Sequence, residues 1–430
     1  MHTASDFAAG LTRRGFSQIV AGMGLSFLLP GLSPAAAERR GGDRKKSLIT
    51  LWMAGGPSQL ETWDPHPGTR VGGDTRAIKT SIPGMKIAHL FPRTAEQIHH
   101  LSVIRSLTSK EGDHERGTYF VKTGYRPDPT LKHPALGAIF AEQTKKADDN
   151  AKQKIEIPRH VSLLKNQWPA RGGFLGPQLD AFKVFNPGKE VRNMKAHVGD
   201  DRRKRRLQDR ELLSRGFARG GFYRVQRTQH EQTLDRALTM MNSNQLKAFL
   251  VDDEPQAVRD GYGDTQFGRG CLVARRLVEG GVRAIEVTLR GFDTHANNYT
   301  GHETQAAILD PAFAALIHDL KTRDLLKSTV VLCIGEFGRT PQINPLEGRD
   351  HWPHFFSCVV GGGGLRSGVL IGETAATTDK QPPKDPVTLP DLYATILKTL
   401  GADHAKEYDT PVGRPMAAVN DGEPIKRLLG

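Results

Sequence analysis

The sequence predicts an α/β protein with a largely parallel sheet, because short buried strands alternate with helical patterns along the chain. Residues 329–334 are apolar, rich in β-branched side chains and too few for a helix, so we interpret them as a buried strand that ends at Gly335. A helical pattern at 310–324 precedes this strand. Open α/β sheets bind ligands beyond the carboxyl ends of their strands, so the residues that follow 334 are candidates for a functional site.

The same alternation extends over most of the chain. We expect strands, all of them short and rich in aliphatic residues, at 47–52, 101–104, 155–161, 282–289, 329–334, 355–360 and 368–371. We expect helices, with apolar residues at helical spacing or a glycine that stops them, at 113–124, 271–278, 310–324 and 389–400. The sequence contains no internal repeat.

The composition suits a large α/β enzyme with many loops better than a helix bundle or a disordered chain. The 430 residues are 37% hydrophobic and include 46 glycines and 26 prolines. A mean hydropathy of −0.45 excludes a protein with several membrane spans. The formal net charge of +13 favours anionic partners without specifying which. Two of the three cysteines lie in predicted strands, so we expect no disulfide framework.

The first 37 residues have the pattern of a twin-arginine signal peptide. Arg13 and Arg14 precede Phe16, an apolar segment follows at 19–32, and small residues at 35–37 offer a cleavage site. The apolar segment is interrupted by glycines and falls short of the roughly 20 apolar residues of a spanning helix, so we expect no stable membrane span. The pattern predicts export by the twin-arginine machinery to the periplasm or beyond the cell.

A strongly charged stretch at about 190–255 interrupts the alternation of strands and helices. It contains five consecutive basic residues at 202–206, followed by apolar residues at helical spacing. The run fits a polyanion-binding patch, and it also fits the solvated face of an inserted helical hairpin, which is the commoner origin of such runs. Because the chain is expected to be exported, we do not expect nucleic acid to be its partner.

Polar side chains follow the predicted strands at the point where each strand ends. Asp293 and His295 follow one strand, Glu336 follows the next, and Asp350 and His351 lie further along that connection. We expect these side chains to share one edge of the sheet. Nitrogen and oxygen ligands of this kind suit zinc or another divalent ion, which would act as a Lewis acid on an anionic ester and activate water or a hydroxyl.

Four segments, GGPSQLETWDP, GFDTH, GEFGRTP and GRDHWP, occur in this order behind the twin-arginine signal. Together they resemble the secreted proteins of the domain-of-unknown-function family 1501, which is similar to sulfatases and belongs with the alkaline phosphatase superfamily. The resemblance covers nearly the whole mature chain. It implies a three-layer α/β/α sandwich over residues 47–430, with a mixed sheet, a site at the carboxyl edge and the charged stretch as a helical insertion.

The resemblance also implies roles for individual residues. Asp293 and His295 resemble metal ligands of the superfamily, and His351 resembles its late single histidine. An Asp-His metal-binding pair of the superfamily corresponds to Glu336 and Phe337, so the acid is matched and the histidine is replaced.

Two further positions depart from the superfamily. The nucleophile position of sulfatases falls on His114, which has neither a hydroxyl nor a thiol. The acid that follows the first strand is missing at 54–55, and Glu61 or Asp64 stand further along. These departures favour a one-metal or an inactive site over a full two-metal site.

We therefore interpret the protein as an exported metal-dependent hydrolase of sulfate or phosphate esters, acting on an anionic small molecule or glycan. Asp293, His295 and His351 would hold a zinc ion, or a calcium or manganese ion, with Glu336 as fourth ligand or base.

Two more residues have expected roles in the reaction. Arg339 would bind the substrate anion, and His114 would act as acid or base. The alternative is an exported protein of the same fold that binds anionic glycan without catalysis.

Overall fold

The structure is a computed structural model that describes residues 44–151, 154–194, 196–219, 229–375 and 381–430. The expected signal peptide at 1–37 lies outside these residues. In the described part of the chain, every helix is too short or too polar to cross a membrane.

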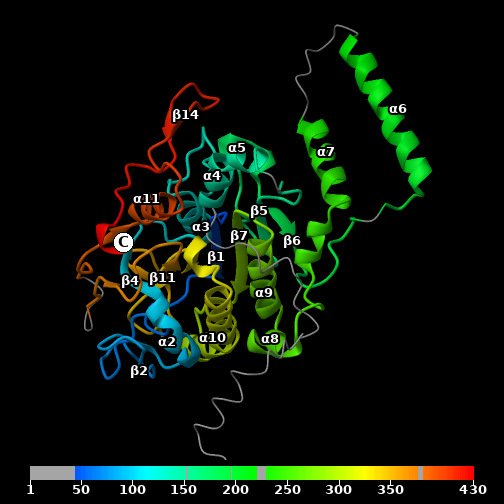
Figure 1. Cartoon of the computed structure of the whole chain (residues 1–430). Coiled ribbons are helices and arrows are strands. Elements are labelled where there is room, and N and C mark those ends of the chain that lie inside the picture. The colour runs from blue at the N-terminus through cyan, green and yellow to red at the C-terminus, as the bar shows by residue number, and fades with distance from the viewer. Residues whose placement is uncertain (1–43, 152–153, 195, 220–228, 376–380) are drawn as a thin grey trace, which may run out of the picture. The chain divides into compact units, whose positions relative to one another are not determined.

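A nine-stranded mixed sheet forms the centre of residues 45–430 (Figure 1). The strand order is β12-β4-β11-β8-β1-β7-β5-β6, and β13 also pairs with β4. The strands are β1 (Ser47–Ala54), β4 (Leu101–Thr108), β5 (His160–Leu163), β6 (Phe182–Val184), β7 (Ala284–Arg290), β8 (Thr329–Ile334), β11 (Phe356–Gly362), β12 (Leu370–Ile371) and β13 (Val387–Thr388). Only β11 runs antiparallel to its neighbours in this sheet, so the sheet is largely parallel as the sequence predicts.

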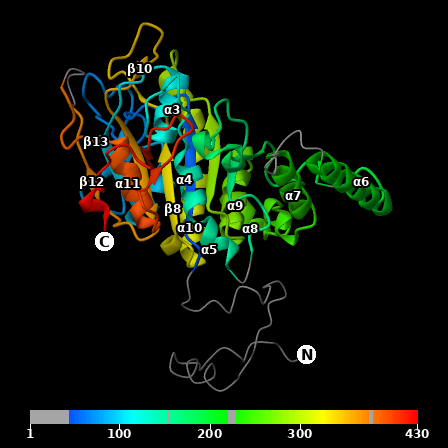
Figure 2. The ribbon, with the colours of Figure 1, turned by 90° about the horizontal axis from the view of Figure 1, so that it is seen from above.

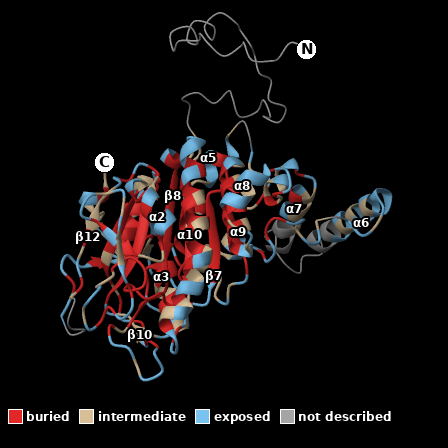
Figure 3. Ribbon diagram, turned by 90° about the horizontal axis from the view of Figure 1, so that it is seen from below, coloured by how far each residue is buried: buried red, intermediate tan, exposed pale blue. Residues whose placement is uncertain are grey.

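Helices cover both faces of the sheet (Figures 1 and 2). On one face lie α2 (Pro92–Gln97), α9 (Gln266–Glu279) and α10 (Asn298–Thr322), and on the other lie α3 (His114–Thr123), α4 (Leu136–Gln143) and α11 (Leu389–Thr399). Both faces of the sheet are therefore buried, as Figure 3 shows. In β1, Leu51 packs with the first set of helices and Leu48 with the second, which explains why the strand is apolar at nearly every position. This arrangement confirms the three-layer sandwich.

The structure shifts most predicted strand boundaries by one or two residues, extends β4 by four residues and changes two further strands more strongly. The strand expected at 155–161 is instead β5 at His160–Leu163, because Pro158 lacks the N–H group that a strand inside a sheet must donate. The strand expected at 368–371 is reduced to the two residues of β12. The charged stretch contains two helices, α6 (Asp200–Arg219) and α7 (Gln229–Met241), and its interpretation as an insertion stays a prediction.

The central strands end level with one another at the edge that carries the candidate residues. Ala54 of β1 lies opposite Arg290 of β7, and Trp52 lies opposite Ile334, the last residue of β8. The loops that follow approach each other closely, since a Cβ atom on Gly55 would lie 2.4 Å from the backbone nitrogen of Asp293. Gly55 has a φ of 118°, which also favours glycine.

At the opposite edge, a buried carboxylate connects α5 (Lys145–Asp149) to the start of β7. Asp148 is fully buried and accepts hydrogen bonds from the Arg283 guanidinium at 3.0 and 2.6 Å. Arg159 donates a further hydrogen bond to it at 3.1 Å. Burial opposes ionisation of Asp148, but the hydrogen bonds and charges, chiefly those of Arg283, outweigh it and lower the pKa of the carboxyl.

We expect the Asp148→Asn variant to lose about 3–5 kcal/mol of unfolding free energy at pH 7, because Arg283 would remain buried without its counter-charge. The lowered pKa means that this stabilisation is complete above the unfolded pKa of about 3.9 and is lost as the pH falls through the folded pKa. Chemical denaturation of both proteins from pH 7 to pH 3 measures the effect. The control is Asp252→Asn, which removes an exposed carboxylate 3.8 Å from Arg259 and should change stability by less than about 1 kcal/mol. Equal losses in the two variants would contradict the role of Asp148.

Candidate metal centre

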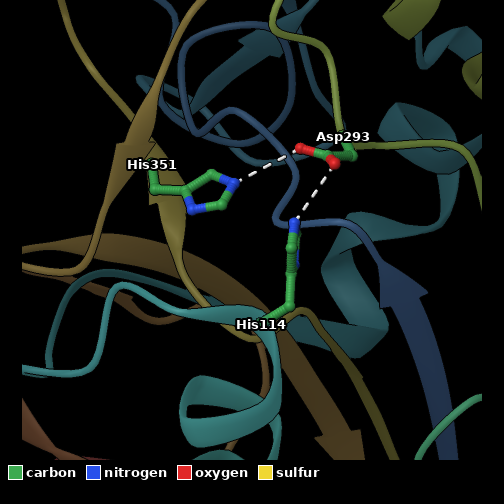
Figure 4. A group of neighbouring side chains, drawn as sticks. All are labelled: His114, Asp293 and His351. Atoms are coloured by element: carbon green, nitrogen blue, oxygen red, sulfur yellow. Dashed lines mark hydrogen bonds and ion pairs between the residues drawn. The ribbon is translucent and has the colours of Figure 1, made fainter.

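Three side chains from separate segments meet at the carboxyl edge of the sheet (Figure 4). Asp293 follows β7, His114 is the first residue of α3, and His351 is the first residue of β10 (His351–Trp352). The two oxygens of Asp293 lie 3.2 Å from His114 Nε2 and 3.3 Å from His351 Nε2. One donor atom from each residue lies within 4.8 Å of the other two, so this group could hold a metal ion.

His295 adds a fourth donor on the solvent side of the group. Its Nε2 atom lies 3.0 Å from His351 Nε2 and 3.2 Å from Asp293 Oδ1. Its Nδ1–H group donates to Asp350 Oδ1 at 2.9 Å. The side chain of His295 is 47% exposed, so it is the more accessible of these two histidines.

In His114 and His351, the Nδ1 atom lies next to a hydrogen-bond acceptor. His114 Nδ1 lies 2.9 Å from Glu336 Oε1, and His351 Nδ1 lies 2.8 Å from the carbonyl oxygen of Gly112. A backbone carbonyl can only accept a hydrogen bond, and an ionised carboxylate accepts as well. The Nδ1 atoms of His114 and His351 therefore carry the protons, and the Nε2 atoms are left with lone pairs. Metal-ligating histidines are oriented in the same way.

The donor groups fit a zinc ion. His114 Nε2 is buried and makes no well-aligned hydrogen bond, and Asp293 Oδ2 at 3.2 Å is the acceptor that it faces, so an ion between the two atoms would serve both. His114, Asp293 and His351 offer donor atoms that all lie within 4.8 Å of one another, and His295 Nε2 lies at the margin of this group, 3.0 Å from His351 Nε2. Three imidazoles and one carboxylate suit zinc better than calcium or magnesium, which prefer oxygen ligands.

The surroundings favour a charged carboxylate among the imidazoles. Burial opposes ionisation of Asp293, but the Arg339 guanidinium, together with His114 and His351, lowers the pKa of its carboxyl to about 2. The hydrogen bond with Glu336 raises the pKa of His114 against the effect of burial. Burial lowers the pKa of His351, which favours its neutral, ligating form.

Glu336 lies next to the donor group and not within it. Its side chain is 2% exposed, and its Oε1 atom accepts hydrogen bonds from His114 and from the backbone N–H of Gly55 at 2.8 Å. In the structure, His114 lies among the possible donors and Glu336 contacts the group through His114, and the roles of both residues stay predictions. The sequence indicated both residues as candidates, but no sequence pattern shows that their side chains are in contact.

Arg339 occupies a place that does not suit the expected binding of a substrate anion. Its fully buried guanidinium donates to the carbonyl oxygens of Gly55, of Gly56 at 2.8 Å and of Arg349 at 2.9 Å, and to Asp293 Oδ1 at 2.6 Å. All three of its nitrogens are used in these bonds, so none faces solvent. We therefore assign Arg339 to holding Asp293 and the surrounding loops.

Phe337 forms an apolar wall beside two of the donor histidines. Its ring centre lies 5.1 Å from that of His114 and 4.5 Å from that of His351. A Cβ atom on Gly117, one turn into α3, would lie 3.0 Å from this ring, so the contact depends on glycine. The aromatic residue at the position where the resemblance implies a histidine therefore packs against the neighbouring imidazoles.

The two acids that follow the first strand have other partners. Glu61 is buried against Arg349 at 2.9 Å, and Asp64 is buried against Arg105 at 3.2 Å. Neither belongs to the donor group, so the site in the described residues is the size of a single metal centre.

Three solved structures are similar to this chain at low sequence identity. A mutant of TAB5 alkaline phosphatase with Mg bound is 14% identical, and the match covers 84% of this chain and 100% of that one with a TM-score of 0.39. The C-terminal periplasmic domain of EcEptC from Escherichia coli is 11% identical, with coverages of 88% and 87% and a TM-score of 0.39. The PsFucS1 sulfatase from Pseudoalteromonas sp. is 12% identical, with coverages of 84% and 68% and a TM-score of 0.36.

None of the curated proteins matches the sequence. The sequence model of the family described as "Protein of unknown function (DUF1501)" matches residues 45–429, which is nearly the whole chain. This match confirms the resemblance found in the four sequence segments. The chain belongs to the DUF1501 family.

Proposed function

We propose that the protein is a zinc-dependent hydrolase of sulfate or phosphate esters that acts after export. The observation that carries the proposal is the donor group of His114, Asp293 and His351, with His295 Nε2 beside it and the other nitrogen of every histidine already bonded. A zinc ion held there would supply Lewis acidity toward an oxygen of an anionic ester. The likeness of the GFDTH and GRDHWP segments to sulfatase ligands supports this class of substrate.

The four donors divide into a held set and an accessible one. His114, Asp293 and His351 are each fixed from the protein side, by Glu336, Arg339 and Gly112 respectively. These three would keep the ion in place.

His295 is the most exposed of the three histidines, and its Nδ1–H group is held by Asp350. His295 would carry the proton of the reaction: with its Nδ1–H held by Asp350, its Nε2 atom would accept a proton from the attacking water and give it to the leaving oxygen.

The first test is the metal content and affinity of the purified mature chain. We expect about one zinc ion per chain in the wild type and a loss of bound zinc in His114→Ala and His351→Ala, because each removes a held ligand. Glu336→Gln should still bind zinc, about 10- to 100-fold more weakly, because it removes only an orienting partner. His354→Ala is the matched control, since this exposed histidine contacts Trp352 and not the donor group. Equal zinc in all four variants would refute the site.

The second test separates catalysis from binding. Aryl sulfates, phosphate monoesters and diesters, and sulfated glycans are assayed with the zinc-loaded protein. We expect His295→Ala to lower turnover by about 10² or more, the usual contribution of a general acid, while it retains more zinc than His351→Ala. If no ester is hydrolysed but sulfated glycan binds the wild type, the non-catalytic binding protein replaces this proposal.

A further inference from the structure

A buried carboxylate beside the candidate metal centre holds two exposed arginines. Glu111 is buried, and its two oxygens accept hydrogen bonds from Arg116 Nε at 2.7 Å and from Arg126 Nε at 2.6 Å. The two arginine side chains are nevertheless 52% and 62% exposed. One carboxylate thus fixes the inner ends of two guanidinium groups whose outer ends face solvent.

The Nη1 and Nη2 atoms of both arginines are not used to hold the fold together. Within the ranges that the structure describes, Arg116 and Arg126 donate side-chain hydrogen bonds through Nε and make none through Nη1 or Nη2. A guanidinium offers five N–H donors in a planar fork, which matches the oxygens of sulfate, phosphate or carboxylate. Anchoring through Nε removes conformational freedom before a ligand arrives, so less binding energy is spent on ordering.

The charges nearby are mixed, so the geometry of the two forks matters more than the net charge. Lys110 is exposed and adds a third cation, whereas Asp113 and Glu115 are acids on the same segment. Asp113 is engaged in capping α3, where it accepts a hydrogen bond from the Arg116 backbone N–H at 3.0 Å. The hydrogen bond from Arg116, aided by that from Arg126, lowers the pKa of Glu111, which keeps the anchor ionised.

The same short segment also serves the metal centre. Glu111 is followed by Gly112, whose carbonyl oxygen holds His351, and by His114, which is a member of the donor group. Arg116 lies in the first turn of the same helix as His114. Residues 111–116 therefore carry both the anchor of the two arginines and a member of the donor group.

We propose that Arg116 and Arg126, held by Glu111, form a second anion-binding subsite that receives a sulfate or phosphate group other than the one at the metal centre. The substrate class is then an ester that carries more than one anionic group, such as an oligosulfate or oligophosphate. The assignment of a substrate class rests on the proposed hydrolase function, whereas anion binding by the arginine pair does not depend on it.

The first experiment measures anion binding without activity. Inorganic sulfate is titrated, at constant ionic strength, into metal-free protein that keeps Asp293, because the ionised carboxylate opposes anion binding at the donor group. We expect Arg116→Gln and Arg126→Gln each to weaken binding about tenfold, the effect of losing charged hydrogen bonds. Arg427→Gln is the matched control, because this exposed arginine already uses its Nη groups on Asp385 and on the carbonyl of Leu370. Equal affinity in all these proteins would overturn the subsite.

Glu111→Gln separates a built subsite from simple charge attraction. Removing a negative charge should strengthen sulfate binding if only net charge matters. We expect weaker binding instead, because both guanidinium groups lose the charged acceptor that holds them. Stronger binding would overturn the proposal, and thermal unfolding of each variant identifies any that fail to fold.

The second experiment uses the active protein. With a substrate that carries two or more anionic groups, Arg116→Gln should raise KM and leave kcat nearly unchanged, and it should have no such effect on a substrate with one anionic group. If both substrates respond equally, the assignment of the substrate class is refuted. If no ester is hydrolysed but sulfate binding still depends on both arginines, the hydrolase proposal fails and the anion subsite stands.

Discussion

The buried guanidinium of Arg339 is the interaction on which the candidate metal centre depends. Arg339 follows β8, and its side chain reaches the carbonyl oxygens of Gly55 and Gly56 after β1, as well as Asp293 after β7. It also bonds the carbonyl of Arg349, in the segment that leads to His351. A buried cation needs such partners to offset the loss of its hydration, so the loops are held where these acceptors converge on it.

The site consists of the donor side chains and, behind them, the residues that hold them in place. The donor groups face one another, and each is held from behind by an acceptor or donor that no substrate needs to touch. His114 depends on Glu336 and His351 depends on the carbonyl of Gly112, while Asp293 depends on Arg339. The protein side of the site is therefore held by these partners, and His295 and Asp350 lie on the side that faces solvent.

The sequence predicts the fold and the sheet edge well because strand ends leave a local signal. Apolar runs that stop at polar residues place Asp293, His295 and His351 at one edge, and the structure brings them together. The direction in which each side chain points depends on contacts between segments that are distant in the sequence, and no local sequence pattern predicts these contacts. His114 lies among the possible donors and Glu336 contacts the group through His114, and Arg339 points into the protein because backbone carbonyls from other loops receive it.

The ligand set of the bound zinc is the most direct test of this account. X-ray absorption spectroscopy of the zinc-loaded wild type should show four nitrogen or oxygen ligands at about 2.0–2.1 Å, with the outer-shell scattering of three imidazoles. At zinc concentrations high enough to load the weakened site, His114→Ala should show two imidazoles, and Glu336→Gln should show three. A wild-type spectrum with two imidazoles, unchanged by His114→Ala, would contradict the assignment of His114 as a ligand.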